Sequence, residues 1–305
     1  MSDAGTLRST NPSLLSRLPV ERVVARVGLI SDTHMPERCA AFPASVFDVL
    51  RGVDLLLHAG DLGELWVLDR LSAIAPVVAV HGNDDTPDAI RELPYQQLLS
   101  IAGQRILLWH SHYPDPVEEQ AHRGGSWQPK LSRLAERGQQ VGAQIVVFGH
   151  AHIPMTCQHD GVWLVNPGAL ASGGIFTRQK RQTVALLLIR DDGTPFVAHV
   201  YLAVPDRLYV PDVDWQAGFE VALDQFQATI VDQGLLEDVA RMRKQTYRDR
   251  EALKRAMLPL SHRCWAGEKQ CITRAELLDE IERSTTISAT DREKVVAILD
   301  RDDRE

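Results

Sequence analysis

The stretch RVGLISDTH (residues 26–34) joins a short apolar run to polar side chains that could bind a metal. The run is rich in β-favouring residues and ends at Ser31-Asp32. Four later stretches repeat this arrangement, namely DLLLHAGD (54–61), VVAVHGNDD (77–85), RILLWHSH (105–112) and IVVFGHAH (145–152). Short apolar runs of this kind are typical of strands that are buried on both faces. We therefore expect buried strands that are each followed by a polar loop.

Three further apolar runs, residues 162–165, 184–189 and 196–202, complete the series. Helical patterns lie between several of the runs, for example in residues 42–50 and 65–75. An alternation of strands and helices predicts an α/β fold built from layers. Ligands bind at the carboxyl ends of the strands in open α/β sheets, so we expect one sheet edge to gather the polar loops.

The polar loops contain hard oxygen donors and imidazoles but no cysteine. They are Asp32-Thr33-His34, Gly60-Asp61, Gly82-Asn83-Asp84-Asp85, His110-Ser111-His112 and Gly149-His150-Ala151-His152. This mixture of ligands suits Mn²⁺, Fe, Zn²⁺ or Ni²⁺ better than a thiolate site would. It offers too many ligands for one ion with an open position, so we expect two ions that share a bridging carboxylate. The glycines before the ligands allow the chain to turn sharply and approach the ions closely.

In this order the motifs resemble those of the calcineurin-like metallophosphoesterase superfamily, and Asn166-Pro167-Gly168 resembles a loop of its YfcE-type phosphodiesterase branch. The resemblance covers residues 24–204 and implies a four-layer αββα sandwich. It implies one metal site made by Asp32, His34, Asp61 and His152, and a second made by Asp61, Asn83, His110 and His150. Asp61 would bridge two divalent ions, with manganese favoured, and a hydroxide between the ions would attack phosphorus in line.

One position departs from the pattern of phosphomonoesterases and protein phosphatases, which carry a histidine after the Gly-Asn pair. That position is Asp84 in this chain. YfcE-type branches also lack the histidine and favour phosphodiesters, and a good leaving group needs less help from a general acid. We therefore expect hydrolysis of a small or nucleotide-like phosphodiester, with Asp61, Asn83 and His112 as catalytic residues. A phosphomonoesterase is the alternative.

Several polar residues near the motifs have more than one interpretation. His112 could contact the substrate phosphate, or it could orient His110. Asp85 could fix a ligand imidazole, which we favour, or form a turn with its neighbours. His58 and His81 are expected to have structural or supporting roles.

Composition restricts the partners and the compartment. The formal charge of −8 is a poor basis for general nucleic-acid binding, which usually needs a basic excess. The four cysteines are scattered and form no CxxC pair, so we expect free thiols in a reducing compartment. No apolar run near the N-terminus is long enough for a signal peptide or a membrane span, which favours a cytoplasmic protein without membrane partners.

The chain is expected to have three parts: a flexible leader (1–23), a metallophosphoesterase domain (24–204) and a helical C-terminal extension (205–305). The extension could bind a protein partner or form a homo-oligomer. Because the superfamily includes a retromer subunit that serves mainly as a protein-binding scaffold, a scaffold is a second candidate function. A scaffold has no need of a complete ligand set, however, and this chain presents all seven ligands.

Within the extension, we expect a helix over residues 235–257 that stops before Pro259. Residues 241–255 carry seven basic side chains, which we interpret as a solvated helix face. Two capping boxes are expected to start further helices, Thr273 with Glu276 and Thr290 with Glu293.

Overall fold

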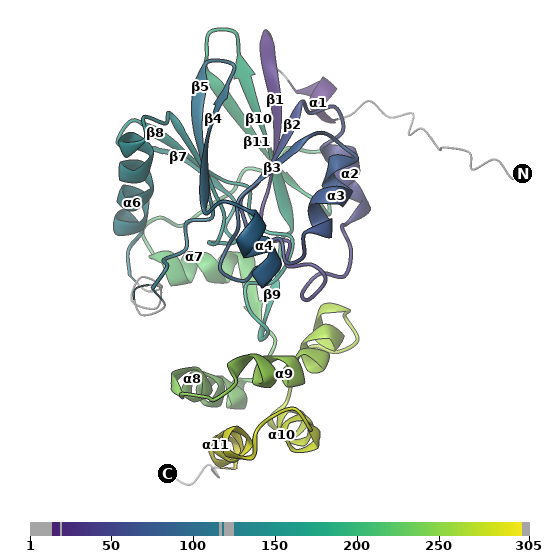
Figure 1. Ribbon diagram of the computed structural model, residues 1–305. Helices are drawn as coiled ribbons and strands as arrows, with labels where there is room; N and C mark the ends of the chain where they lie inside the picture. Colours follow the sequence, from purple (N-terminus) through teal and green to yellow (C-terminus); the bar gives the residue numbers. More distant parts are fainter. Residues whose placement is uncertain (1–13, 19, 116–117, 119–124, 301–305) are drawn as a thin grey trace, which may run out of the picture. The chain divides into compact units, whose positions relative to one another are not determined.

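The computed structural model describes residues 14–18, 20–115, 118 and 125–300 (Figure 1). These residues form two compact units. The first unit holds the described residues up to Ala171 together with Arg181–Phe226, and the second holds Ser172–Lys180 and the described residues from Gln227. Residues 1–13 of the predicted leader lie outside the described residues, and α1 (Leu14–Arg17) is a single short turn of helix. No helix in the described ranges is both long and apolar enough to cross a membrane.

The first sheet of unit one has five strands. Their order is β11 (Pro195–Tyr201), β10 (Thr183–Arg190), β1 (Val23–Ile30), β2 (Leu55–His58) and β3 (Val77–Ala79). Strands β1, β2 and β3 run parallel, whereas β10 is antiparallel to both β1 and β11. Every residue of β10 except Arg190 is buried, which agrees with the uninterrupted apolar run in the sequence.

The second sheet of unit one also has five strands. Their order is β4 (Gln96–Ile101), β5 (Gln104–Trp109), β6 (Ile145–Phe148), β8 (Val162–Asn166) and β7 (Met155–His159). Strands β5, β6 and β8 run parallel. The two strands of this sheet that the sequence analysis did not predict, β4 and β7, are its edge strands. Their residues are partly polar and only partly buried, so they lack the apolar run that identifies an interior strand.

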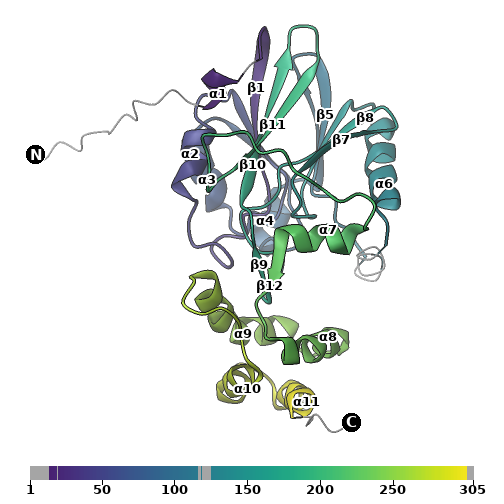
Figure 2. The same cartoon turned by 180° about the vertical axis from the view of Figure 1, so that it is seen from behind.

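The two sheets face each other across a shared apolar layer. Val27, Leu29 and Leu57 of the first sheet belong to the same buried cluster as Ile106 and Val147 of the second. Helices cover the outer faces, as Figures 1 and 2 show. Helices α2 (Ala44–Val49) and α3 (Trp66–Ser72) pack on the first sheet, and α6 (Trp127–Gln140) and α7 (Phe219–Phe226) pack on the second. The predicted four-layer αββα sandwich is confirmed.

The second unit consists of a two-stranded ribbon and helices. Its elements are β9 (Thr177–Gln179), β12 (Gln227–Thr229), η1 (Gln233–Leu235), α8 (Leu236–Lys244), α9 (Arg250–Trp265), α10 (Arg274–Arg283) and α11 (Ala289–Leu299). Ile230, Leu235, Met257, Ile281 and Val295 contribute to a core that is separate from those of the first unit. The expected C-terminal helices are therefore present, and α8 to α11 share their own hydrophobic core, whereas α7 belongs to the first unit.

The helix expected over residues 235–257 is instead two helices. Asp249 starts α9 by accepting a hydrogen bond from the backbone N–H of Ala252. Helix α9 then continues through Pro259 to Trp265, so the expected stop before the proline is wrong. Pro259 is exposed, whereas Met257 and Leu260 are buried, so packing on both sides of the proline outweighs the lost backbone hydrogen bond.

One of the two expected capping boxes is confirmed. Thr273 and Glu276 form it at the start of α10. The N-cap of α11 is Ser288, whose hydroxyl accepts from the backbone N–H of Asp291, so the expected box at Thr290 is wrong. Asp291 is buried and also accepts hydrogen bonds from the backbone of Arg248, which ties α11 to the chain before α9.

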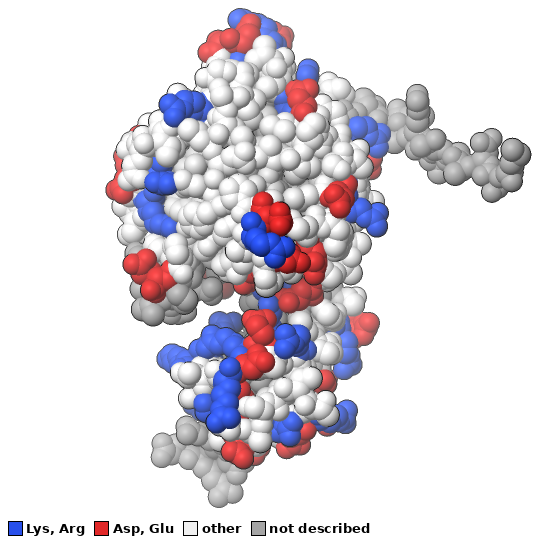
Figure 3. Space-filling view, in the orientation of Figure 1, with Lys and Arg blue, Asp and Glu red and all other residues white. Residues whose placement is uncertain are grey.

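Basic side chains gather on the second unit over α8 and the start of α9 on the face shown in Figure 3. Arg241, Arg243 and Lys244 are exposed. Arg241 makes an ion pair with Glu237 four residues earlier, at 3.1 Å. These features fit the interpretation of a solvated helix face.

Burial of His199 in β11 makes the stability of the first unit depend on pH. Its Nε2 lies 2.8 Å from Oγ1 of Thr156 in β7, so it links the two sheets. Burial lowers the pKa of His199 to about 4 from its ordinary value of 6.5. The stability from the neutral imidazole is therefore present above pH 6.5 and is lost as the pH falls toward 4.

We expect wild-type protein to lose about 2 kcal/mol more stability than His199→Gln between pH 7 and pH 5. The measurement is urea unfolding of metal-free protein followed by tryptophan fluorescence, since every tryptophan except Trp265 lies in the first unit. Parallel pH dependence of the two proteins would contradict the assignment to His199.

Candidate metal centre

The seven predicted ligands follow strands of both sheets. Asp32 and His34 follow β1, Asp61 follows β2 and Asn83 comes after β3 in the first sheet. His110 follows β5, and His150 and His152 follow β6, in the second sheet. The expectation that one sheet edge gathers them is wrong, because the parallel strands of two sheets end at the same place. The sandwich itself thus brings together residues that are more than a hundred positions apart.

Left-handed backbone conformations turn the chain at these strand ends. Five of the seven predicted ligands have positive φ: Asp32 (53°), His34 (43°), Asp61 (53°), His150 (67°) and His152 (56°). Residues other than glycine seldom adopt this region, and each such residue costs on the order of 1–3 kcal/mol. Directing these side chains toward the clusters therefore lowers the stability of the fold.

The glycines before the ligands are required mainly by close packing. A Cβ on Gly82 would lie 2.0 Å from Oδ1 of Asp61, and one on Gly149 would lie 2.2 Å from Oγ of Ser31. A Cβ on Gly60 would lie 2.6 Å from Nδ1 of His110. Only Gly60 of these three also has a positive φ, of +88°, so the expectation of a sharp turn holds for Gly60 alone.

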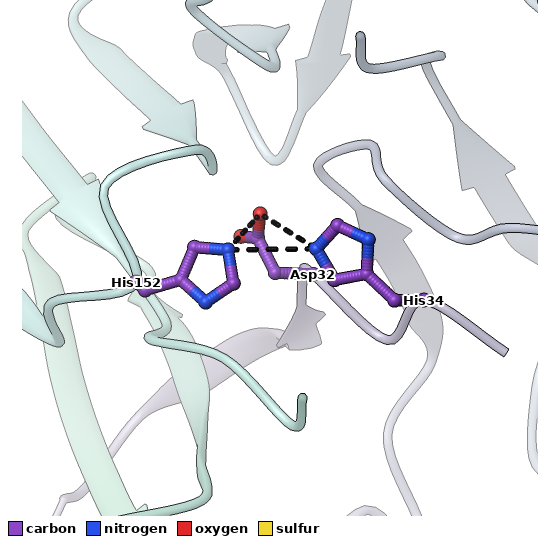
Figure 4. Close-up of side chains that lie close together, drawn as sticks. All are labelled: Asp32, His34 and His152. Atoms are coloured by element: carbon purple, nitrogen blue, oxygen red, sulfur yellow. Dashed lines mark hydrogen bonds and ion pairs between the residues drawn. The ribbon is translucent and has the colours of Figure 1, made fainter. Parts of the chain in front are cut away.

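Asp32, His34 and His152 form the first candidate metal cluster, in which one ligand atom from each lies within 4.8 Å of the others. Figure 4 shows the three side chains pointing toward one another. Nε2 of His152 lies 3.1 Å from Oδ1 of Asp32, and Nε2 of His34 lies 3.5 Å from Nε2 of His152. All three side chains are at most 5% exposed.

Asp61, His110 and His150 form the second candidate cluster by the same distance criterion. Nε2 of His110 lies 3.2 Å from Oδ2 of Asp61. The same carboxylate oxygen lies 3.6 Å from Nε2 of His34 in the first cluster. Asp61 therefore faces both clusters, which is the position that a bridging carboxylate needs.

Backbone carbonyls orient two of the imidazoles. Nδ1 of His110 lies 2.7 Å from the carbonyl oxygen of Ala59, and Nδ1 of His152 lies 3.0 Å from that of Ala171. A carbonyl can only accept, so each Nδ1 carries a proton, and Nε2 is the nitrogen of each ring that faces a cluster and could bind a cation. Second-sphere hydrogen bonds of this kind typically orient metal-binding histidines, so the residues fit a pair of divalent cations.

The charges of the buried side chains also favour the binding of cations at this centre. Burial lowers the pKa of His110, but the carboxylates of Asp61 and Asp32 outweigh it and raise that pKa to about 10. Burial raises the pKa of Asp32, but the charges of His152 and His110 outweigh it and hold that pKa below its ordinary value. The centre thus attracts positive charge strongly, and divalent cations can supply that charge in place of protons.

The turn after β3 approaches the second cluster through its backbone. Asn83 is exposed, and its Nδ2 donates to Oδ1 of Asp84 at 3.2 Å. The backbone N–H of Asp84 donates to Oδ1 of Asp61 at 2.8 Å. The carboxylate of Asp84 also lies within 4.8 Å of ligand atoms of His34 and Asp61, a proximity that the sequence analysis did not predict.

Asp85 connects loops rather than an imidazole. Its buried carboxylate accepts hydrogen bonds from the backbone N–H groups of Gly82 and Gly63, both at 2.7 Å, and of Asp61 at 3.2 Å. Burial and the charge of Asp61 raise its pKa to about 6. The favoured interpretation, that Asp85 fixes a ligand imidazole, is therefore wrong, because the carboxylate ties the loop after β2 to the turn after β3.

Three further histidines named in the sequence analysis lie beside the centre, namely His112, His81 and His58. The ring of His112 lies 5.5 Å from that of His110 and 6.3 Å from that of His150, so both interpretations of His112 stay open. The ring of His81 lies 6.0 Å from that of His112. His58 lies with its Nε2 3.1 Å from Oγ1 of Thr33, and burial lowers its pKa to about 3.

Two supporting residues were assigned no contact by the sequence analysis. Asn166 is buried, donates to the carbonyl of Gly149 at 2.9 Å and accepts from the N–H of Gly168 at 2.8 Å. It therefore fastens the loop that carries His150.

Arg38 is buried beside the first cluster and makes an ion pair with Asp84 at 2.5 Å. The sequence does contain a signal for this ion pair, because the basic residue Arg38 follows His34 by four positions and the turn after β3 is acidic.

A pocket of about 200 Å³ opens beside the first cluster. It is lined by His34, Met35, Pro36, Glu37, Gly63, Glu64, Asp84 and Thr86. The pocket thus extends from a predicted ligand, His34, to the residue that replaces the histidine of phosphomonoesterases, Asp84.

This chain is similar to several known proteins. A probable metallophosphoesterase of Methanothermobacter thermautotrophicus is 38% identical over 144 residues, which cover 47% of this chain and 76% of that protein. One of Methanocaldococcus jannaschii is 34% identical over 145 residues, 47% of this chain and 67% of that protein. A crystal structure of a Vps29 variant from Entamoeba histolytica is 24% identical, with a TM-score of 0.43, and covers 58% of this chain and 98% of that chain.

The sequence model of the calcineurin-like phosphoesterase superfamily domain matches residues 26–192, which contain all seven predicted ligands. The match spans more than half of the 305 residues and ends before the second unit's helices. The chain therefore belongs to the calcineurin-like phosphoesterase superfamily.

Proposed function

We propose that this chain is a phosphodiesterase that depends on two divalent cations, with manganese favoured, and that hydrolyses a small or nucleotide-like phosphodiester. The observation that carries the proposal is the position of Asp61 between two clusters of ligand atoms. A single cation would need only one of these clusters. A carboxylate shared between two clusters is the arrangement of two-metal phosphoesterases.

Each ligand has a defined place in the proposal. Asp32, His34, Asp61 and His152 hold the first cation, and Asp61, Asn83, His110 and His150 hold the second. When bound, the two cations supply an activated water nucleophile and offset the negative charge that develops on the phosphoryl oxygens. In this proposal His112 contacts the substrate phosphate from beside His110, whose ring lies 5.5 Å away.

In this proposal, the stability of the leaving group determines whether a phosphodiester or a phosphomonoester is the better substrate. No histidine follows Asn83, and Asp84 in that place makes an ion pair with Arg38. An ionised carboxylate cannot donate a proton to a departing oxygen. The reaction therefore suits esters whose leaving group is stable as an anion, such as an aryl or acidic alcohol group.

A purely scaffolding function is disfavoured by the same cluster. Holding left-handed residues and buried carboxylates together costs stability that protein binding alone does not require. Elemental analysis of purified protein separates the two functions, because an enzyme should hold about two ions per chain and a scaffold need hold none.

Asp61→Ala is expected to remove activity on an aryl phosphodiester such as bis-p-nitrophenyl phosphate with Mn²⁺. The loss should exceed about a thousandfold in kcat/KM, because both clusters lose their shared ligand. The measurement combines initial rates with metal content by mass spectrometry, which should also fall.

The matched control for this variant is Asp48→Ala, since Asp48 is 60% exposed and lies on α2. It should retain wild-type activity and metal content. No turnover by the wild type with Mn²⁺, Fe²⁺, Ni²⁺ or Zn²⁺ would refute the proposed function.

Asn166→Ala is expected to lower kcat/KM by about ten- to a hundredfold, because the loop of His150 loses its fastening. The variant also leaves the buried Gly149 carbonyl and Gly168 N–H without Asn166, at a cost of about 1–3 kcal/mol for each group. Steady-state kinetics and urea unfolding measure the two effects. Gln158→Ala on the adjacent strand β7 is the control, since Gln158 is exposed. Loss of stability with full activity would show that Asn166 does not position the loop.

A further inference from the structure

Asp84 places a carboxylate at the edge of the metal centre. One of its oxygens lies within 4.8 Å of ligand atoms of both His34 and Asp61. Its backbone N–H donates to Oδ1 of Asp61 at 2.8 Å, which keeps the residue beside the shared carboxylate. Asp84 also lines the pocket that opens next to His34. A phosphate group bound at the centre would therefore lie close to this carboxylate.

Arg38 holds that carboxylate from the protein side. Its Nη2 lies 2.5 Å from Oδ2 of Asp84, and its Nε lies 3.3 Å from Oε1 of Glu37. The Arg38 side chain is 3% exposed, whereas that of Asp84 is 32% exposed. A substrate that approaches from solvent therefore comes closer to the carboxylate of Asp84 than to the guanidinium of Arg38. Arg38 carries one positive charge, and Glu37 and Asp84 carry one negative charge each, so these three side chains together have a net charge of −1.

The bonds to Arg38 and Asp61 also fix where the charge lies. A guanidinium at hydrogen-bond distance stabilises the ionised form of Asp84. Because the Arg38 side chain is almost completely buried, its own position is set by packing. The charge of Asp84 is therefore held in a constant position relative to the metal centre.

We propose that Asp84, held by Arg38, is a specificity-determining residue that discriminates against phosphomonoesters. This inference rests on the proposed phosphodiesterase function. A phosphomonoester carries nearly two negative charges at neutral pH, and a phosphodiester carries one. The fixed carboxylate repels the additional charge. At a separation of about 5 Å and an effective dielectric constant between those of water and a protein surface, the repulsion amounts to about tenfold in affinity.

The test compares kcat/KM for p-nitrophenyl phosphate and bis-p-nitrophenyl phosphate, as a ratio of monoester to diester. Asp84→Asn keeps the shape and the backbone N–H but removes the charge, and we expect the ratio to rise by about tenfold. Raising the ionic strength should increase the ratio in the wild type, because salt screens the repulsion, and should have little effect on it in Asp84→Asn. Arg38→Lys should keep a ratio close to the wild type, because an ammonium group retains the ion pair.

A binding measurement checks the same repulsion without catalysis. Titration calorimetry of metal-loaded protein with inorganic phosphate at pH 8 should show about tenfold tighter binding to Asp84→Asn than to the wild type. Asp88→Asn is the matched control, because Asp88 on α4 (Pro87–Glu92) carries the same charge and is 69% exposed. The control should change neither the ratio nor the phosphate affinity.

An unchanged ratio and an unchanged phosphate affinity in Asp84→Asn would overturn the inference and leave the proposed function intact. Loss of a metal ion in that variant, measured by mass spectrometry, would also overturn it, because Asp84 would then be a ligand. If the wild type hydrolyses neither ester, the proposed function fails, and the phosphate titration alone decides whether Asp84 repels a dianion.

Discussion

The buried carboxylate of Asp61, which lies within reach of imidazoles from both sheets, is the constraint on which the first unit depends. An ionised carboxylate in a protein interior is costly unless hydrogen bonds and opposite charges surround it. Asp61 accepts a hydrogen bond from the backbone of Asp84 and lies close to His34 and His110. Two divalent cations would supply the remaining positive charge, so ligand burial and metal binding are parts of one electrostatic balance.

The loops around Asp61 hold the charged side chains of the centre at fixed positions. Left-handed residues aim the ligands, and glycines let the loops approach so closely that a single added carbon would collide with Asp61 or His110. Asp85 and Asn166 then fasten the loops through their backbones, one in each sheet. Neither residue is a predicted ligand, but the geometry of the centre depends on both because ligands on loosely held loops would not remain within range of an ion.

The proposed specificity of this protein depends on residues that surround the predicted ligands. Asp84 stands where phosphomonoesterases have a histidine, and its partner Arg38 is contributed by the loop after β1. The second unit has its own core, and its helices lie outside the region that matches the superfamily.

The sequence by itself determined the layered α/β class and the interior strands, because both depend on local patterns, and its resemblance to the superfamily implied the sandwich and the seven predicted ligands. An apolar run buried on both faces, such as that of β10, is visible in the residues, and so is the order of Asp, Asn and His after the runs. Local patterns failed at edge strands β4 and β7, which are partly polar, and at α9, where packing outweighs Pro259. Only the tertiary structure decided that two sheets share the centre, that Asp85 and Asn166 fasten loops, and that Arg38 pairs with Asp84. Each of these contacts joins segments whose approach depends on how the strands are stacked, and that information lies in no single stretch of sequence.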